Sequence, residues 1–233
     1  MFDYADAPET FAGAIREDIK AAHRRFWERL AQPGCWWNGA ERVAIARESR
    51  NALGEADSDT DGSLPPRAID AAHTIILNQA SISRAWVEDN AANGLSKEAY
   101  VELVGIVVAV FSIDEFHRAL GLPLEPLPVP VPGNPSGYRP AHLAEDIGFV
   151  PTVPPDGAVG NEADLWQQGR TANVVRALTL VPDALRDWRD LGGAQYLSFE
   201  AMGNFVGLPD RTLNRMQAEL IAGRVSAVNE CFY

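Results

Sequence analysis

The chain has 233 residues and a formal net charge of −12 at pH 7, from 20 Lys and Arg against 32 Asp and Glu. Binding to phosphates needs clustered basic side chains, so this charge argues against a nucleic-acid partner. The longest apolar run, residues 103–111, is far shorter than the roughly 20 residues of a membrane-spanning helix, and the acidic N-terminal sequence shows no signal-peptide pattern. The two cysteines, Cys35 and Cys231, are too few for a disulfide framework. We therefore predict a cytoplasmic protein with no membrane partner.

Helical periodicity dominates the sequence, which predicts an all-α fold. In the first strong segment, Ile19, Ala22, Phe26 and Leu30 fall on one helical face, with charged residues opposite. The predicted helices are residues 10–31, 39–53, 66–93, 96–120, 171–192 and 210–229.

Capping residues mark two of these helices. Ser96 is the expected N-cap and Gly121 the expected C-cap of an almost wholly apolar helix, which should therefore be buried. Asp210 is the expected N-cap of the last helix.

The segment from residue 123 to residue 155 holds ten of the chain's 16 prolines, and so it should contain no long helix. One interpretation is a semi-rigid connector of polyproline type. The other is a strap that packs along the surface through Leu124, Leu127, Val129 and Val131.

The two halves of the chain resemble each other in two short blocks. The block "AAHRRFWERL" aligns with "PDALRDWRDL", and "AERVAIARESRNAL" aligns with "AELIAGRVSAVNEC". One interpretation is an internal repeat. The alternative is that the likeness is a coincidence among helices rich in Ala and Arg. The aligned pairs include Trp27 with Trp188, Glu41 with Glu219, Asn51 with Asn229, and Leu53 with Cys231.

Glu219 and Cys231 stand in an E-x11-C arrangement. If the chain turns at Asn229 and Glu230, Cys231 begins a following helix, where backbone N–H groups would stabilise a thiolate. Glu219 lies about 15 Å back along its own helix and cannot touch Cys231 directly. The alternative is a surface carboxylate and a small buried cysteine.

The segment "QAELIAGRVSAVNECFY" resembles the start of the redox motif E-x11-C-x-x-C-x3-H of AhpD-like alkylhydroperoxidases, in the carboxymuconolactone decarboxylase superfamily. Glu219 and Cys231 match its first two positions. The segment "VRALTLVPDALRDWRDL" resembles the helix before that motif, and residues 94–133 resemble the helices after it in tandem members. The resemblance implies an AhpD-like helical fold with two repeats, the second incomplete. Its expected parts are a first repeat without redox cysteines at residues 1–122, a Pro-rich connector at 123–159 and a second repeat at 160–233.

The same resemblance implies an alkylhydroperoxidase-like enzyme that reduces peroxides, or exchanges disulfides, with a thiol or selenol. Glu219 and Cys231 would be its catalytic residues, with no cofactor and no metal. A peroxide or disulfide substrate, a dithiol reductant and a homo-oligomer are the implied partners. The alternatives are a redox-dead helical scaffold of the same superfamily and a cofactor-free decarboxylase-type member.

The second redox residue of the motif would be residue 234 and its histidine residue 238, beyond Tyr233. We expect a UGA codon for selenocysteine at position 234 and an inactive or impaired 233-residue chain. The rival explanations are an ordinary nonsense mutation and a fragmentary gene model. Cys35, in a turn beside two Trp, is disfavoured as a substitute second thiol.

The four histidines show no metal-binding spacing. His23 and His73 are expected to be satisfied packing residues. His117 either lines a pocket with Asp114 or is favoured by the C-terminal end of its helix.

Overall fold

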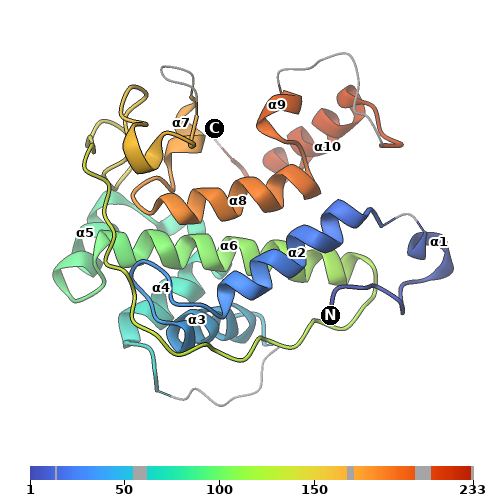
Figure 1. Ribbon diagram of the computed structural model, residues 1–233, viewed down its shortest axis with the longest axis horizontal. Coiled ribbons are helices and arrows are strands. Elements are labelled where there is room, and N and C mark those ends of the chain that lie inside the picture. The colour runs from blue at the N-terminus through green and yellow to red at the C-terminus, as the bar shows by residue number, and fades with distance from the viewer. Residues whose placement is uncertain (14, 55–61, 167–170, 203–210, 232–233) are drawn as a thin grey trace. The chain divides into compact units, whose positions relative to one another are not determined.

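The computed structural model describes residues 1–13, 15–54, 62–166, 171–202 and 211–231. These residues fold into helices joined by turns and extended segments, which confirms the predicted all-α class (Figure 1). In the described part of the chain the β structure is limited to one isolated antiparallel bridge, Ala144 with Thr152. The chain divides into two compact units, Met1–Leu191 and Gly192–Tyr233, which are described separately.

The α-helices are α1 (Glu9–Ala12), α2 (Glu17–Leu30), α3 (Gly39–Asn51), α4 (Pro66–Leu77), α5 (Arg84–Ala92), α6 (Lys97–Ala119), α7 (Asn173–Arg176), α8 (Pro182–Gln195), α9 (Phe199–Met202) and α10 (Arg215–Val228). Two short 3-10 helices are η1 (Gln79–Ser81) and η2 (Gly160–Glu162).

Helix α6 is the central helix of the larger unit, with α3 and α4 packed against it and α2 crossing nearby (Figure 1). Its Ser96 N-cap accepts a hydrogen bond from the Ala99 N–H, as the sequence predicts. Gly121 follows the C-cap Leu120 with a φ of 68°, a left-handed conformation that favours glycine. The apolar side chains of α6 lie on several of its faces because the helix is buried on more than one side.

Two of the long helices predicted from periodicity are each interrupted. The 66–93 prediction is wrong because α4 ends before Asn78, and α5 begins only after Ser83, whose hydroxyl caps the Trp86 N–H. The 171–192 prediction is wrong because Pro182 starts α8 and disfavours helical geometry at the residue before it. Local capping chemistry therefore overrides a continuous apolar pattern.

The predicted ends of the first and last helices also need correction. The main N-terminal helix begins at Glu17 rather than residue 10, since α1 is a separate short helix. The last helix begins at Arg215 with Asn214 as its N-cap. Asp210, the predicted cap, lies outside the described residues.

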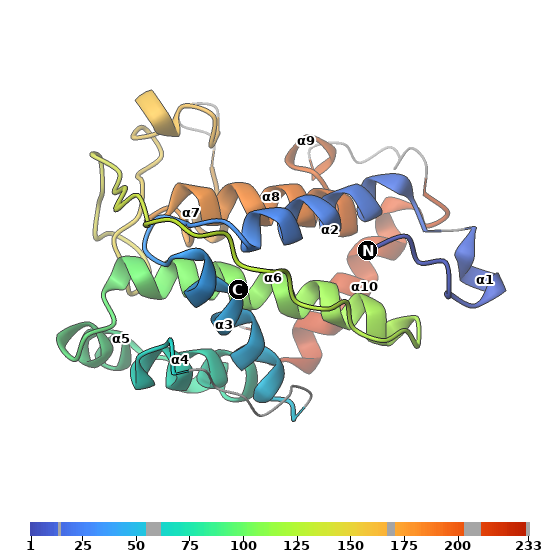
Figure 2. The same ribbon diagram turned by 60° about the horizontal axis from the view of Figure 1, so that its bottom comes forward.

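The proline-rich segment 123–155 contains no helix, and all of it is described, so that prediction is confirmed. Its first part runs as a strap beside α2 (Figure 2). The indole N–H of Trp27 donates to the carbonyl oxygen of Pro126 at 2.8 Å, and the Val131 N–H donates to the carbonyl of Ala31 at 2.8 Å. The strap interpretation therefore describes the path of this part of the chain. The predicted packing through Val129 and Val131 is wrong, because both side chains are exposed, and the backbone hydrogen bonds hold the strap instead.

The smaller unit contains the end of α8, the short α9 and α10. A guanidinium N–H of Arg215 donates to the carbonyl of Ala201 at 3.0 Å and links α10 to α9. Large apolar side chains of this unit are exposed: Leu213, Met216, Leu220, Ile221, Val225 and Val228. The predicted repeat boundaries concern likeness of sequence, and they stay a prediction.

Candidate functional site

Cys231 lies just beyond the C-terminal end of α10. Its N–H donates to the carbonyl of Ser226 at 2.9 Å, and the Glu230 N–H donates to Ala227 at 3.4 Å. Glu230 has a φ of 51°, so the helix closes with a Schellman motif whose left-handed residue is a glutamate instead of the usual glycine. Cys231 is exposed. The expectation of a helix that starts at Cys231 falls mainly on residues outside the described range.

Glu219 lies in the second turn of α10. Its carboxylate forms an ion pair with Arg215, one turn earlier, at 2.7 Å, and it hydrogen bonds with Tyr196, whose pKa is raised chiefly by burial. The nine residues from Glu219 to the end of α10 at Val228 span about 14 Å. The structure therefore does not bring Glu219 and Cys231 together, in agreement with the distance expected from the sequence.

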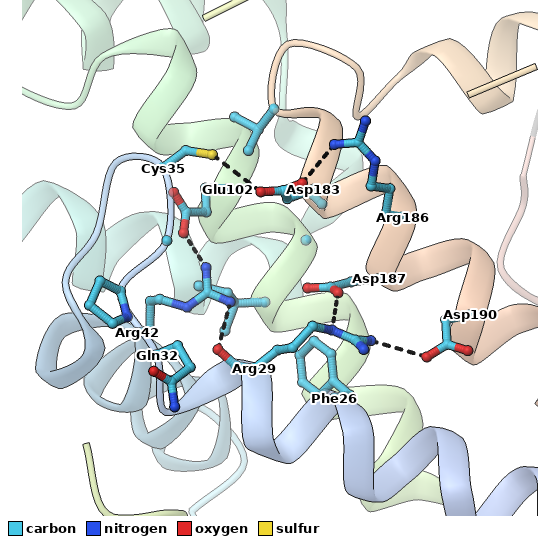
Figure 3. A pocket seen from close by; sticks show the side chains of 16 residues that line it. Phe26, Arg29, Gln32, Cys35, Arg42, Glu102, Asp183, Arg186, Asp187 and Asp190 are labelled. Atoms are coloured by element: carbon cyan, nitrogen blue, oxygen red, sulfur yellow. Dashed lines mark hydrogen bonds and ion pairs between the residues drawn. The ribbon is translucent and has the colours of Figure 1, made fainter. Parts of the chain in front are cut away.

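The larger unit holds a cavity of about 450 Å³ at the end of α2, the α2–α3 loop, α6 and the start of α8 (Figure 3). Charged side chains from several elements point toward one another there. The lining residues that carry polar side chains are Arg29, Gln32, Cys35, Arg42, Glu102, Asp183, Arg186, Asp187 and Asp190. Sequence reasoning did not find this cavity.

A buried ion pair forms one wall of the cavity. Arg42 of α3 pairs with Glu102 of α6, and the two side chains are 8% and 3% exposed. The second carboxylate oxygen of Glu102 accepts the Trp36 N–H at 2.6 Å. Gly34 passes so close to this pair that a Cβ at that position would overlap both charged groups. A side chain at residue 34 would therefore have to displace the Arg42–Glu102 pair.

Three aspartates of α8 line the opposite wall. Asp183, Asp187 and Asp190 recur at helical spacing and so share one face of α8. Asp187 forms an ion pair with Arg29, and Arg29 also reaches Asp190 at 3.2 Å. Burial raises the pKa of the Asp187 carboxyl, and the nearby arginines offset this only in part. The spacing of these aspartates is visible in "PDALRDWRDL", but the arginine partners of Asp187 and Asp190 on α2 lie more than 150 residues earlier.

Cys35 lies in the same cavity, where its thiol donates to Asp183 at 3.7 Å. Burial raises the pKa of Cys35 to about 11, and the Asp183 carboxylate adds to the effect. A thiol in this state is a weak nucleophile at neutral pH because the thiolate is the reactive form.

His23 and His117 occupy packing positions, whereas His73 is partly exposed and pairs with Glu48, and His142 is exposed. His23 is fully buried and its Nδ1 shares a hydrogen bond with the Tyr4 hydroxyl. His117 is buried and its Nδ1 contacts the Ile113 carbonyl, whereas Asp114 forms a two-pronged ion pair with Arg50. Another cavity of the larger unit is lined by His117 but not by Asp114. Within the described residues, no group of three or more His, Cys, Asp or Glu is placed to hold a metal ion.

The described residues thus form an all-α structure with an exposed thiol at Cys231 and a polar cavity beside α8. Comparisons with protein-family models, with curated proteins and with solved structures found no match. None of the helices in the described part combines the length and apolarity that crossing a bilayer requires.

Proposed function

We propose that this chain is an AhpD-like protein of the cytoplasm that acts in thiol-dependent redox chemistry, with Cys231 as the reacting thiol. The exposure of Cys231 carries the proposal. Cys231 is the cysteine that matches the redox motif, and it is also the one that a dissolved peroxide can reach. Cys35 is buried, and its raised pKa disfavours the same chemistry.

The local structures of α3 and α10 support the two-repeat part of this proposal. In each helix an asparagine N-cap, Asn38 or Asn214, forms a capping box with the residue three positions later. Helix α3 ends at Asn51, and α10 ends at Val228, one residue before Asn229, which aligns with Asn51. The two helices thus begin with the same kind of cap, although Asn214 lies two residues before the position that aligns with Asn38, and their ends differ by one aligned position.

The proposed reaction is a two-electron oxidation of Cys231. The thiolate sulfur attacks one oxygen of an organic hydroperoxide, the O–O bond breaks, and the alcohol leaves with the proton taken from the thiol. Cys231 becomes a sulfenic acid. A dithiol reductant then forms a mixed disulfide with release of water, and its second thiol restores Cys231 as the reductant closes to a disulfide.

Single-turnover labelling tests this proposal. The reduced protein is exposed to one equivalent of cumene hydroperoxide with dimedone, which traps sulfenic acids, and the peptides are analysed by mass spectrometry. We expect the adduct on Cys231. A thiol with the pKa of about 11 of Cys35 has a thiolate fraction on the order of a hundredfold below that of an ordinary cysteine, so its label should be minor.

Two serine variants provide matched controls. Cys231→Ser should abolish the adduct, and Cys35→Ser should keep it. An adduct that follows Cys35, or none on Cys231, would overturn the proposal. Glu219 enters through the resemblance as part of a proton relay, and α10 alone does not bring it to Cys231. A Glu219→Gln variant oxidised at the wild-type rate would remove Glu219 from the proposal and leave Cys231 in it.

A helical scaffold is the second candidate, and the exposed apolar row on α10 favours it. Met216 is 82% exposed and Leu220 is 74% exposed. Apolar rows of this kind are typical of surfaces that associate with another chain. We propose a homo-oligomer on this ground. Assembly without any oxidation of Cys231 in the labelling experiment would favour the scaffold.

A further inference from the structure

The strap, residues 123–132, is held in an extended conformation by its prolines. Five of its ten residues are proline. A proline fixes its own φ at about −65° and disfavours helical geometry at the residue before it. Every residue from Glu125 to Pro132 is either a proline or the residue before one. The strap is therefore restricted to geometry close to polyproline II, and Figure 2 shows it as an extended segment.

One ridge of the strap faces solvent. A polyproline II helix has three residues per turn, so residues three apart lie on the same side. Exposed residues recur at this spacing, and they form the ridge Pro123, Pro126, Val129 and Pro132. The residues between the first three are half-buried, whereas those beyond Val129 are exposed as well. Val129 is 86% exposed, the highest value for a large apolar side chain among the described residues.

The backbone of the strap keeps unused hydrogen-bond acceptors. The carbonyl of Glu125 accepts from the Arg50 guanidinium at 3.0 Å. The carbonyl of Pro126 accepts from the Trp27 indole at 2.8 Å. Residues 127–130 make no hydrogen bond with any described residue, and polyproline II forms none internally. Their carbonyl oxygens are therefore left for water or for a partner.

The anchors of the strap keep its ridge in one conformation. The bonds to Glu125 and Pro126 hold its middle, and the Val131 N–H bonds to the Ala31 carbonyl at 2.8 Å. A segment that is already ordered loses little conformational freedom when it binds. The contact with Trp27 also shows the chemistry that suits this backbone, because an aromatic ring with an N–H donor meets a proline-rich carbonyl.

The composition of the strap selects one kind of partner. Four of the seven residues 126–132 are prolines, which lack the N–H that pairing with a β-strand requires. The same residues carry no charged side chain, so recognition through charge is excluded. A second copy of the strap would offer few donors to the unused carbonyls. Grooves lined by aromatic side chains bind proline-rich segments in the polyproline II conformation.

We infer that residues 126–132 are a docking site for another protein, one whose aromatic-lined groove recognises polyproline II segments. Pro126, Val129 and Pro132 pack on the rings of that groove. The carbonyls of residues 127–130 accept hydrogen bonds from its tyrosine hydroxyl or tryptophan indole groups. This inference does not rest on the chemistry at Cys231.

Titration with three recombinant modules tests the inference: an SH3 domain, a WW domain and an EVH1 domain, which all bind proline-rich segments. Each module is isotope-labelled, and the full unlabelled chain is added at pH 7 while the NMR signals of the module are followed. We expect at least one module to bind with a Kd below about 1 mM. The shifted signals should belong to the aromatic groove of that module.

Variants of the strap locate the binding. Val129→Glu places a charge on the ridge and should weaken binding by about tenfold or more, because the charge would lose water in an apolar groove. Val174→Glu makes the same change at an exposed side chain of α7 and should leave binding unchanged. Pro130→Gly keeps the ridge but frees the backbone, so binding should weaken about two- to fivefold. Pro135→Gly, at an exposed position beyond the strap, is its control.

Binding that Val129→Glu weakens and Val174→Glu preserves supports the site. The inference is overturned if none of the three modules binds, or if Val129→Glu binds as tightly as the wild type. It is also overturned if Val129→Glu changes the sedimentation of the chain alone, because a second copy would then cover the ridge. Circular dichroism separates loss of binding from loss of structure. If Val129→Glu does not fold, the comparison of Pro130→Gly with Pro135→Gly decides in the same way.

Discussion

Arg29 and Asp190, which occupy equivalent positions in the two aligned sequence blocks, contact each other between α2 and α8 at 3.2 Å. The two helices run antiparallel at this contact (Figures 1 and 2). Equivalent positions that meet across antiparallel helices are expected of two repeats related by a local two-fold axis, as in an isologous interface. The contact therefore supports the repeat interpretation with an observation that the sequence alone does not provide.

The first prediction concerns the ion pairs of Asp190. Asp190 accepts from Arg25 in a two-pronged arrangement and also pairs with Arg29, so it joins two arginines. We expect Asp190→Ala to lower the free energy of unfolding by about 1 kcal/mol, the upper end for surface ion pairs. Urea unfolding of the variant and the wild type measures this change in the free energy of unfolding. Asp89→Ala, which breaks the single exposed pair with Arg67, is the control and should cost less than about 0.5 kcal/mol.

The second prediction concerns acid sensitivity through His23. Burial, with a contribution from His117, lowers the pKa of His23 from 6.5 to about 3 in the folded protein. Below pH 6.5 the unfolded chain binds a proton that the folded chain does not, so stability falls as the pH falls from about 6.5 toward 3. Between pH 6.5 and pH 5 this amounts to about 2 kcal/mol.

Unfolding experiments across this pH range compare the wild type with two variants. His23→Gln should flatten the dependence of unfolding free energy on pH, whatever its own effect on stability. His142→Gln, at an exposed position, should leave the slope unchanged. Equal slopes for the wild type and His23→Gln would show that His23 is not the group responsible.

The third prediction concerns the loop glycine beside the Arg42–Glu102 pair. In Gly34→Ala the new Cβ would overlap the Glu102 carboxylate, which is also held by the Trp36 N–H. Disturbing this buried pair should cost about 2–4 kcal/mol of unfolding free energy. Gly13→Ala is the control because nothing lies within 4 Å of its added Cβ. A thermal shift for Gly34→Ala no larger than that for Gly13→Ala would contradict the geometry of the loop.

The fourth prediction concerns association through α10. Leu220→Glu places a charge within the exposed apolar row and should weaken self-association by about tenfold or more, as sedimentation equilibrium measures. Val129→Glu makes the same change of charge at a single exposed side chain of the strap, and it should leave association unchanged. A monomeric wild type at all concentrations would refute the proposed oligomer.

Helix class and capping chemistry were readable from the sequence because both depend on near neighbours. The N-cap at Ser96 and the turn at Gly121 follow from local hydrogen bonding and backbone geometry. The interruptions near Asn78 and Pro182 were missed because the apolar pattern continues across them. The cap at Ser83 and the proline at residue 182 are the local features that end the apolar pattern's helix at each place.

The candidate functional residues also divide into those found from local spacing and those brought together only by helix packing. Glu219 and Cys231 came from spacing along one segment, and their roles remain proposals. The polar cavity joins α8 to residues of α2, the α2–α3 loop, α3 and α6, so no spacing rule could assemble it. The pairing of Arg29 with Asp187 depends on how α2 and α8 pack.

The sequence by itself determined that this protein is built from helices and that residues 123–155 contain no helix. It also determined that the central helix begins after Ser96 and ends before Gly121. These properties follow from interactions within a few residues, such as apolar periodicity, capping and the missing N–H of proline. Only the tertiary structure decided that Cys35 is buried beside Asp183 while Cys231 is exposed, and that Arg42, Glu102 and Asp187 share one cavity. Burial and charge pairing are set by residues distant in the chain, and so they emerge only when the helices pack.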